Sequence, residues 1–255
     1  MDVRDKVAVV TGGAQGIGLG LCTRFAHDGA HVVLSDLSQE KCERAAEPIG
    51  AFPVAANVGR EDDIAQLVAA TMERFGRIDL FVSNAGIAVD GGLETSNEGW
   101  HKIIDVNLMS QVFAARHAVP HMLEQGSGYL LNVASAAGLL VIPDTVSYTV
   151  TKHASIGFTE WLAVMYGGRG IGVSVLCPAA VLTPILAGKE DTPEGQDAIT
   201  TEQLAELVIE GLADERFMIN THPWVLEKFA IKARDYDEYI RTLRADIPDA
   251  VAAAS

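Results

Sequence analysis

Cysteine is scarce in this chain, and its pattern does not indicate a disulfide framework. The 255 residues include three cysteines, an odd number, at the widely spaced positions Cys22, Cys42 and Cys177. All three lie in apolar or helix-like patterns. Reduced, buried thiols are the simplest account, as in a cytosolic protein.

Basic side chains are also few. The 19 Lys and Arg residues are outnumbered by 34 Asp and Glu residues, which gives a formal net charge of −15. Nucleic acids and anionic membranes are bound by basic surfaces that neutralise phosphate charge. The composition therefore argues against both kinds of partner.

Long apolar runs and metal-ligand clusters are missing as well. No run approaches the length of a membrane-spanning helix, and the N-terminus has neither the apolar core nor the cleavage site of a signal peptide. We therefore expect a cytoplasmic protein with no membrane partner. The histidines are scattered, and the pair His117 and His121 is not part of a set of ligands at metal-binding spacing, so no metal site is predicted.

Short apolar runs alternate with helical patterns along most of the chain. Proline is rare, with 9 residues, and 49% of the residues are hydrophobic, enough for one sizeable core over 1–255. Strands buried on both sides, each followed by a helix, specify an α/β fold: a doubly wound Rossmann-type domain with a parallel seven-stranded sheet and helices on both faces. The predicted strands include 7–11, 31–36, 51–58, 78–84, 129–135 and 172–178, with helices at about 39–48, 61–75 and 100–124.

A glycine turn follows the first predicted strand. In TGGAQGIG, Gly12, Gly16 and Gly18 permit a tight turn and a close approach of the backbone to a pyrophosphate, which the next helix N-terminus would attract. Asp36 ends the second strand, where a carboxylate can accept both ribose hydroxyls and repels a 2′-phosphate. No Lys or Arg occupies 35–38 and Gln15 is neutral, so NAD is favoured over NADP.

A hydroxyl, a phenol and an ammonium occur together later in the chain. Tyr148 and Lys152 are four residues apart, which places them on one face of a helix, and Ser135 precedes them at the end of an apolar run. An ammonium near a phenol favours the phenolate, which makes the phenol a usable acid or base. The implied chemistry is proton transfer at a carbonyl or alcohol oxygen. Taken alone, the pair is equally compatible with an exposed helix face.

These motifs together resemble the short-chain dehydrogenase/reductase family, in its single-domain branch. The resemblance covers nearly the whole chain up to about residue 186, and it rests on motifs in the family's order and spacing: Thr11 to Gly18, Asn84-Ala85-Gly86, Asn107, Ser135, and Tyr148 with Lys152.

The resemblance implies a role for each catalytic residue. Tyr148 would transfer the proton, and Ser135 would position the substrate oxygen. Lys152 would lower the pKa of Tyr148 and hold the nicotinamide ribose, and Asn107 would anchor a water for proton relay. The hydride belongs to the nicotinamide, so the protein supplies orientation and electrostatics.

The resemblance also implies further cofactor contacts. Asn57 and Val58 stand where the family usually has Asp-Val against the adenine, and an Asn can still donate and accept there. Ordinary strand-end packing is the alternative reading for each of the remaining positions, which are Ile17 at the pyrophosphate, Asn84, Ala85 and Gly86 on the adenosine side, and Pro178, Val181 and Thr183 at the nicotinamide.

Two segments depart from regular structure or from the family. The polar insert at about 186–200 follows the end of a strand, which favours a flexible flap over the substrate, although a plain surface loop has the same composition. The family's short glycine-rich end is replaced by a helical extension at about 223–255. It is either a surface helix packed by its aromatics or a helix folded over the pocket. A homotetramer is therefore in doubt, while a homodimer through the long helices remains plausible.

The predicted activity is interconversion of a secondary alcohol and a ketone with NAD. Apolar residues after Ser135, at 139–142, indicate a neutral, bulky substrate of aryl, terpenoid or steroid type. Two alternatives stay open. One is a catalytically silent NAD-binding regulatory protein, and the other is a lyase or epimerase that retains its NAD.

Overall fold

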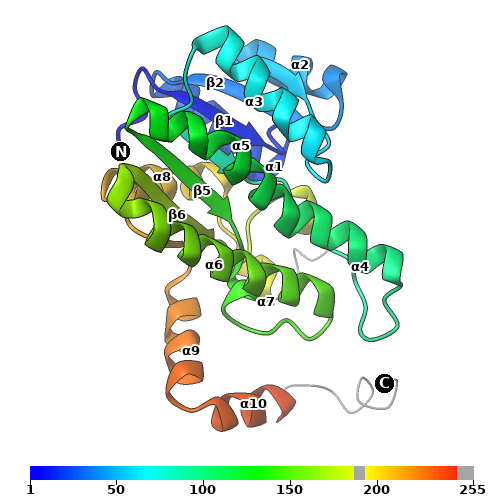
Figure 1. Cartoon of the computed structure of the whole chain (residues 1–255). Coiled ribbons are helices and arrows are strands. Elements are labelled where there is room, and N and C mark those ends of the chain that lie inside the picture. Colours follow the sequence, from blue (N-terminus) through cyan, green and yellow to red (C-terminus); the bar gives the residue numbers. More distant parts are fainter. Residues whose placement is uncertain (187–192, 246–255) are drawn as a thin grey trace.

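The computed structural model describes residues 1–186 and 193–245, and these form a single parallel sheet with helices on both faces (Figure 1). Its seven strands have the order β3-β2-β1-β4-β5-β6-β7, which confirms the predicted doubly wound fold. The strands are β1 (Val7–Thr11), β2 (His31–Asp36), β3 (Phe52–Ala55), β4 (Leu80–Ser83), β5 (Gly128–Val133), β6 (Ile171–Cys177) and β7 (Met218–Asn220).

Two apolar cores lie on the two faces of this sheet. On one face, Leu21 and Phe25 of α1 and Leu204 of α8 join the buried side chains of β1 and β2. On the other, Ile64 of α3 and Leu162 of α6 pack on β1, β4 and β5. The helices are α1 (Gly16–His27), α2 (Gln39–Ala46) and α8 (Thr201–Ala213) on the first face, and α3 (Glu61–Phe75), α5 (Ser110–Gln125) and α6 (Val146–Tyr166) on the second.

Some boundaries differ from the predicted ones. β3 ends at Ala55 because the chain then turns, and the N–H of Asn57 donates to Asp63 in the first turn of α3. The long helix expected through 100–124 is three elements: α4 (Asn97–Ile104), the wide π turn η2 (Asp105–Met109) and α5. A π turn inserts one residue into a helix and is frequent at functional sites.

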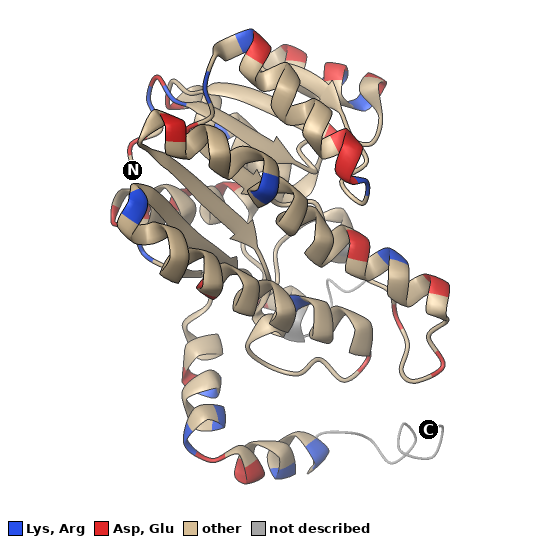
Figure 2. Cartoon of the chain, in the orientation of Figure 1, with Lys and Arg blue, Asp and Glu red and all other residues tan. Residues whose placement is uncertain are grey.

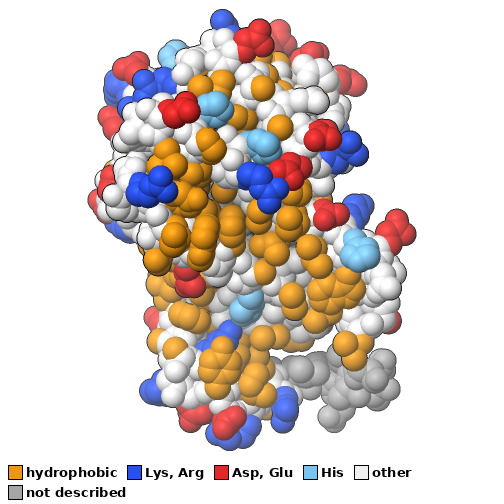
Figure 3. Space-filling view, in the orientation of Figure 1, with side chains coloured by type: hydrophobic (Ala, Val, Ile, Leu, Met, Phe, Trp, Pro, Cys, Tyr) orange, Lys and Arg blue, Asp and Glu red, His pale blue; other side chains and the backbone are white. Residues whose placement is uncertain are grey.

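The face formed by α5 and α6 is poor in charge. Charged side chains lie mainly on the outer helices and turns (Figure 2), whereas α6 contains only Lys152 and Glu160. Hydrophobic side chains gather over α5 and α6 in the middle of this face (Figure 3). Trp161, Val164 and Met165 of α6 are among its exposed members.

The predicted C-terminal extension is helical over the residues described. α9 (Pro223–Arg234) and α10 (Tyr236–Ala245) lie at the far end of the molecule from α2 and α3 (Figure 1). Their apolar side chains join a third cluster with residues that follow β5, such as Leu139 and Leu140. Residues 246–255 of the extension lie outside the described part of the chain, as do 187–192 of the predicted flap. The short turn η5 (Pro184–Leu186) leads into the predicted flap, and α7 (Pro193–Gln196) lies within it.

Within 1–186 and 193–245, none of the helices combines the length and apolar character needed to cross a bilayer.

Candidate active site

The glycine turn between β1 and α1 is closed tightly. Gly12 and Gly16 have φ values of +64° and +54°, a region that glycine adopts at little cost. A Cβ at Gly18 would lie 2.0 Å from the Gly12 carbonyl oxygen, so only glycine fits there. Gln15 is the N-cap residue of α1, and within the described residues its side chain makes no capping hydrogen bond. The first N–H groups of α1 therefore remain available to an anion.

Asn84 and Ala85, which follow β4, hold this turn in place through hydrogen bonds. The Asn84 amide nitrogen donates to the carbonyl oxygens of Thr11 (2.9 Å) and Gly12 (3.2 Å). In return, the Thr11 hydroxyl accepts the N–H groups of Asn84 and Ala85, at 3.1 and 3.2 Å. Asn84 thus braces the turn through its side-chain nitrogen. Thr11 is a supporting residue whose role the sequence analysis did not identify, although it opens the glycine motif.

Asp36 and Asn57 lie on the other side of the glycine turn. Asp36 Oδ2 accepts the N–H of Ala14 at 3.2 Å, which ties β2 to the turn. The Ala56 N–H donates to the Asp36 carbonyl oxygen at 2.9 Å, so Asn57 follows directly beside Asp36. Asn57 is exposed and its Oδ1 accepts the Gly59 N–H at 3.1 Å, whereas Val58 is buried. The two predicted adenine contacts therefore have different surroundings.

The π turn η2 places Asn107 in the interior. Its Oδ1 accepts the Ile87 N–H at 2.9 Å, and its Nδ2 donates to the Ile87 carbonyl oxygen and to Thr151 Oγ1, at 2.9 and 3.2 Å. Asn107 therefore links the segment after β4 to α6. A Cβ at Gly86 would lie 3.4 Å from Asn107 Oδ1 and 3.5 Å from Lys152 Nζ, so both atoms face this glycine.

Ser135, Tyr148 and Lys152 are brought together as predicted. Ser135 follows β5, and its hydroxyl hydrogen-bonds the Tyr148 phenol from helix α6. The Lys152 Nζ lies 5.5 Å from the centroid of the Tyr148 ring and donates to the Val133 carbonyl oxygen at 3.0 Å. Lys152 is almost fully buried. Its ammonium is thus fixed beneath the phenol by the end of β5.

Burial shifts the pKa values of both Tyr148 and Lys152. Protein atoms crowd the Tyr148 hydroxyl, and this burial raises the pKa of Tyr148, while the hydrogen bond from Ser135 lowers it in part. Burial also lowers the pKa of Lys152 to about 8. Desolvation is therefore the largest influence on the pKa of both groups, and the predicted lowering of the Tyr148 pKa by Lys152 stays a prediction.

The segment after β6 completes the site. The Pro178 carbonyl oxygen accepts the Ala136 N–H at 2.8 Å and the Ser135 hydroxyl at 3.4 Å, which joins the ends of β5 and β6. Val181 is buried and forms a short parallel bridge with Ile199. A Cβ at Gly16 would lie 3.4 Å from the Thr183 side chain, so Thr183 lies beside the glycine turn.

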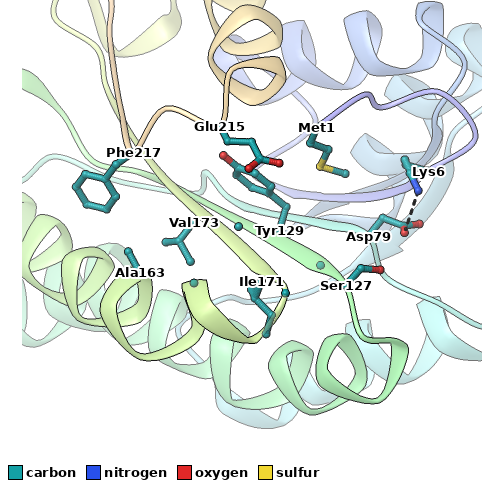
Figure 4. Close-up of a pocket in the computed structure, with 14 residues that line it drawn as sticks. Met1, Lys6, Asp79, Ser127, Tyr129, Ala163, Ile171, Val173, Glu215 and Phe217 are labelled. Carbon is teal, nitrogen blue, oxygen red and sulfur yellow. Dashed lines mark ion pairs between the residues drawn. The ribbon is translucent and has the colours of Figure 1, made fainter.

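All these groups lie at the carboxyl ends of the parallel strands. A cavity of about 450 Å³ lies at the opposite, amino-terminal edge, where Lys6, Asp79, Ser127 and Ile171 begin or precede strands (Figure 4). None of Ser135, Tyr148 and Lys152 lines that cavity, so it is separate from the candidate active site. In the described residues, no three His, Cys, Asp or Glu side chains are grouped to hold a metal ion.

The fold and the site together define a dinucleotide-binding α/β protein with a Ser–Tyr–Lys set. The glycine cradle fits a dinucleotide, because Gly12 and Gly18 let the turn, the end of β4 and the start of α1 pack closely, and the first N–H groups of α1 remain available to a phosphate. Asp36 ends β2, which lies on one side of β1 in the sheet. Tyr148 is on α6, which follows β5 on the other side of β1. The two residues therefore lie on opposite sides of the switch point between β1 and β4, where the strand order reverses.

Comparison with known proteins assigns the family. Residues 6–194 match the model of the short chain dehydrogenase family. The chain is 38% identical over 204 residues to 2-(R)-hydroxypropyl-CoM dehydrogenase of Xanthobacter autotrophicus, covering 76% of this chain and 82% of that protein. It is 31% identical over 236 residues to cyclohexanol dehydrogenase of an Acinetobacter species, with coverage of 88% and 94%.

A solved structure has the same fold. A short chain dehydrogenase/reductase from Burkholderia phymatum, crystallised in complex with NAD, superposes with a TM-score of 0.85 at 30% identity, covering 93% of this chain and 96% of that one. The chain therefore belongs to the short-chain dehydrogenase/reductase family of oxidoreductases.

Proposed function

We propose that this protein is an NAD-dependent oxidoreductase that interconverts a secondary alcohol and a ketone. The observation that carries this proposal is the contact of Ser135 with Tyr148 above a buried Lys152, beside the glycine turn. A hydroxyl and a phenol that share a hydrogen bond can both reach one oxygen of a substrate. The reaction type is therefore proton transfer at that oxygen, coupled to a hydride transfer.

The protein's own groups would act in the following way. Tyr148 removes the proton from an alcohol, or returns it to a forming alkoxide, and Ser135 holds the same oxygen by its hydroxyl. Lys152 places a positive charge under the Tyr148 ring, which favours the phenolate when the site is closed to water. When bound, the nicotinamide supplies or accepts the hydride.

NAD is the proposed cofactor. The carboxylate of Asp36 lies beside the glycine turn, where it would accept ribose hydroxyls and repel a 2′-phosphate. The related Burkholderia structure is a complex with NAD. The residues proposed to hold NAD are Gly12, Gln15, Gly16, Ile17, Gly18, Asp36, Asn57, Val58, Asn84, Ala85, Gly86, Tyr148, Lys152, Pro178, Val181 and Thr183.

Asn107 is proposed to assist proton relay. Its Nδ2 is occupied by two acceptors, whereas Oδ1 accepts one donor and keeps a second lone pair. Because Oδ1 and Lys152 Nζ both face Gly86, a water beside this glycine would connect Lys152 to Asn107.

The proposed substrate is a neutral, apolar alcohol or ketone of some bulk. Leu139 and Leu140 after Ser135 are buried, and Val141 and Ile142 keep part of their surface exposed toward solvent. No Lys or Arg lies between Ser135 and Tyr148 to bind an anionic substrate. The related Acinetobacter protein is a cyclohexanol dehydrogenase, which is consistent with a cyclic alcohol here.

A spectrophotometric screen tests the proposed function. Purified protein is assayed with NAD and separately with NADP against cyclic, aryl, terpenoid and steroid alcohols, following the absorbance of the reduced nicotinamide. We expect turnover with NAD, and a loss of about 10²–10⁴-fold in kcat for Tyr148→Phe. NADH binding by this variant should match that of the wild type. NADH binding without any turnover in the wild type would favour a regulatory protein, and turnover without net NADH release would favour a lyase or epimerase.

A homodimer through α5 and α6 is the proposed assembly. Trp161, Val164 and Met165 of α6 are exposed, and Val164 has an exposed fraction of 81%. Hydrophobic side chains gather over the face that α5 and α6 form (Figure 3). An apolar patch of this kind favours association. Light scattering should show a dimer or larger oligomer for the wild type and a smaller species for Val164→Glu. Equal masses for the two proteins would exclude this face.

The single-domain organisation and the cytoplasmic location are also proposals. The described clusters all pack on one sheet, which supports a single folding unit. The three cysteines are free and buried, as expected in a reducing compartment.

A further inference from the structure

Lys232 is a buried cation outside the groups assigned above. It lies on α9 and is 5% exposed. Its Nζ donates to the Leu139 carbonyl oxygen at 2.7 Å and contacts His153 Nε2 at 3.1 Å. No carboxylate pairs with it in the described part of the chain. Burying an ammonium is costly unless its hydrogen bonds are satisfied, so these two acceptors determine where α9 can lie.

Aromatic rings complete the surroundings of this cation. The Nζ atom lies 5.5 Å from the ring centroid of Tyr236 and 5.7 Å from that of Tyr239, both on α10. Cation–π contacts at these distances are favourable. Tyr239 also uses its hydroxyl, which accepts the Val141 N–H at 2.9 Å. The two C-terminal helices thus reach the same loop through two side chains.

The loop held in this way connects Ser135 to Tyr148. Leu139 is bound through its carbonyl oxygen by Lys232, and Val141 through its N–H by Tyr239. The next residue, Ile142, is bound through its N–H (3.1 Å) and carbonyl oxygen (3.3 Å) by the hydroxyl of Thr149 on α6. Residues Leu139–Ile142 are therefore fixed by their backbone atoms from two sides.

The same network reaches the helix that carries the catalytic pair. The His153 Nδ1–H donates to the Thr149 carbonyl oxygen at 2.9 Å, which leaves Nε2 to accept from Lys232. Thr149 and His153 directly follow Tyr148 and Lys152. A Cβ at Gly138 would lie 2.6 Å from the Lys152 carbonyl oxygen, so the start of the loop presses against α6.

We propose that Lys232 and Tyr239 are positioning residues that hold Leu139–Ile142 as one wall of the substrate site. The C-terminal helices would then determine which alcohols fit, without touching the reacting atoms. This inference rests on the proposed function for its effect on substrate, whereas the anchoring of the loop can be measured separately.

Four variants test the anchoring. Lys232→Met removes the donor at similar length, and Tyr239→Phe removes only the acceptor oxygen. Lys228→Met and Tyr236→Phe are matched controls, because both side chains lie on the same helices but are exposed and make no hydrogen bond to the loop. Hydrogen–deuterium exchange should show that peptides spanning 139–149 exchange at least about tenfold faster in Lys232→Met, and faster in Tyr239→Phe, but not in the controls.

Steady-state kinetics tests the effect on substrate. For a bulky alcohol, KM should rise about tenfold in Lys232→Met, while KM for NAD stays unchanged and kcat changes little. Lys232→Arg, which keeps a donor, should restore most of the affinity. The ratio of kcat/KM for bulky alcohols to that for small alcohols should fall in both Lys232→Met and Tyr239→Phe.

The outcomes separate this inference from the proposed function. Unchanged hydrogen–deuterium exchange of the loop in both Lys232→Met and Tyr239→Phe would overturn the inference, whether or not the wild type turns over an alcohol. Faster exchange with unchanged substrate KM and selectivity would also overturn it, because the loop would then not form a wall. A wild type without turnover would contradict the proposed function, and the exchange rates would still decide whether Lys232 holds the loop.

Discussion

The two ends of the site are built in different ways. At the glycine turn, contacts come from backbone atoms and short side chains at strand ends, such as Thr11, Asn84 and Asp36. At the proposed substrate end, the loop Leu139–Ile142 is held by long side chains from α9 and α10. The glycine turn tolerates few substitutions, because backbone atoms there contact one another directly. The arrangement of the loop can change when the C-terminal helices change, while the proposed catalytic residues stay in place.

Replacing Gly18 by Ala should break the glycine-turn end most severely. The added Cβ would lie 2.0 Å from the Gly12 carbonyl oxygen, so the turn must open. We expect NADH affinity to fall by about 100-fold or more, with a loss of roughly 1–3 kcal/mol in the free energy of unfolding. Fluorescence titration and thermal unfolding measure the two effects.

The control for this change is Gly157→Ala on α6, where no atom lies within 4 Å of the new Cβ. It should keep NADH affinity and gain up to about 1 kcal/mol, because alanine favours a helix. Equal NADH affinity in Gly18→Ala and the wild type would show that the turn does not bind the cofactor.

Asp36→Asn tests the cofactor preference at the glycine turn without a steric clash in the turn. The amide oxygen can still accept one of the two N–H groups, those of Ala14 and Leu37, that the carboxylate now binds, but the negative charge proposed to repel a 2′-phosphate is gone. The ratio of kcat/KM for NAD to that for NADP should fall by about tenfold to 100-fold. Asp62→Asn, an exposed carboxylate on α3, should leave the ratio unchanged. A ratio that stays constant in Asp36→Asn would mean that another group selects the cofactor.

Lys152 lies between the two ends, and its burial predicts a pH-dependent cost. The pKa of Lys152 is lowered from 10.5 to about 8, so between these values the unfolded chain binds more protons than the folded one. Stability contributed by this group therefore rises from pH 8 to 10.5, and below pH 8 the buried charge is destabilising by roughly 3 kcal/mol at most.

Lys152→Met should accordingly be inactive yet more stable than the wild type at pH 7. Its advantage in urea unfolding should shrink as pH rises above about 8, toward the usual lysine value. A variant that is less stable at pH 7 would show that the bond to the Val133 carbonyl oxygen outweighs the burial cost.

The sequence predicted one end of the site better than the other. The glycine turn, Asp36 and the Tyr148–Lys152 pair follow from local spacing, because each lies directly after a strand or on one helix face. The π turn at Asn107 has no such signal, because the residues of η2 read as a continuous helix.

Lys232 was also missed, although its spacing contains a hint. Val225, Phe229 and Lys232 follow the i, i+4, i+7 pattern of an apolar stripe, and both Val225 and Lys232 are buried. A lysine on such a stripe must meet buried acceptors. Which acceptors it meets depends on a loop 93 residues away in the sequence, and local patterns do not encode that pairing.

The loop Leu139–Ile142 is fastened by its backbone, and this has a consequence for protein engineering. Lys232, Tyr239 and Thr149 bind carbonyl oxygens and N–H groups that every residue except proline provides. The side chains of Val141 and Ile142 are thus free to be exchanged while the fastening persists. A library randomised at these two positions would reshape the wall without loosening it, and natural relatives could diverge in substrate by the same route.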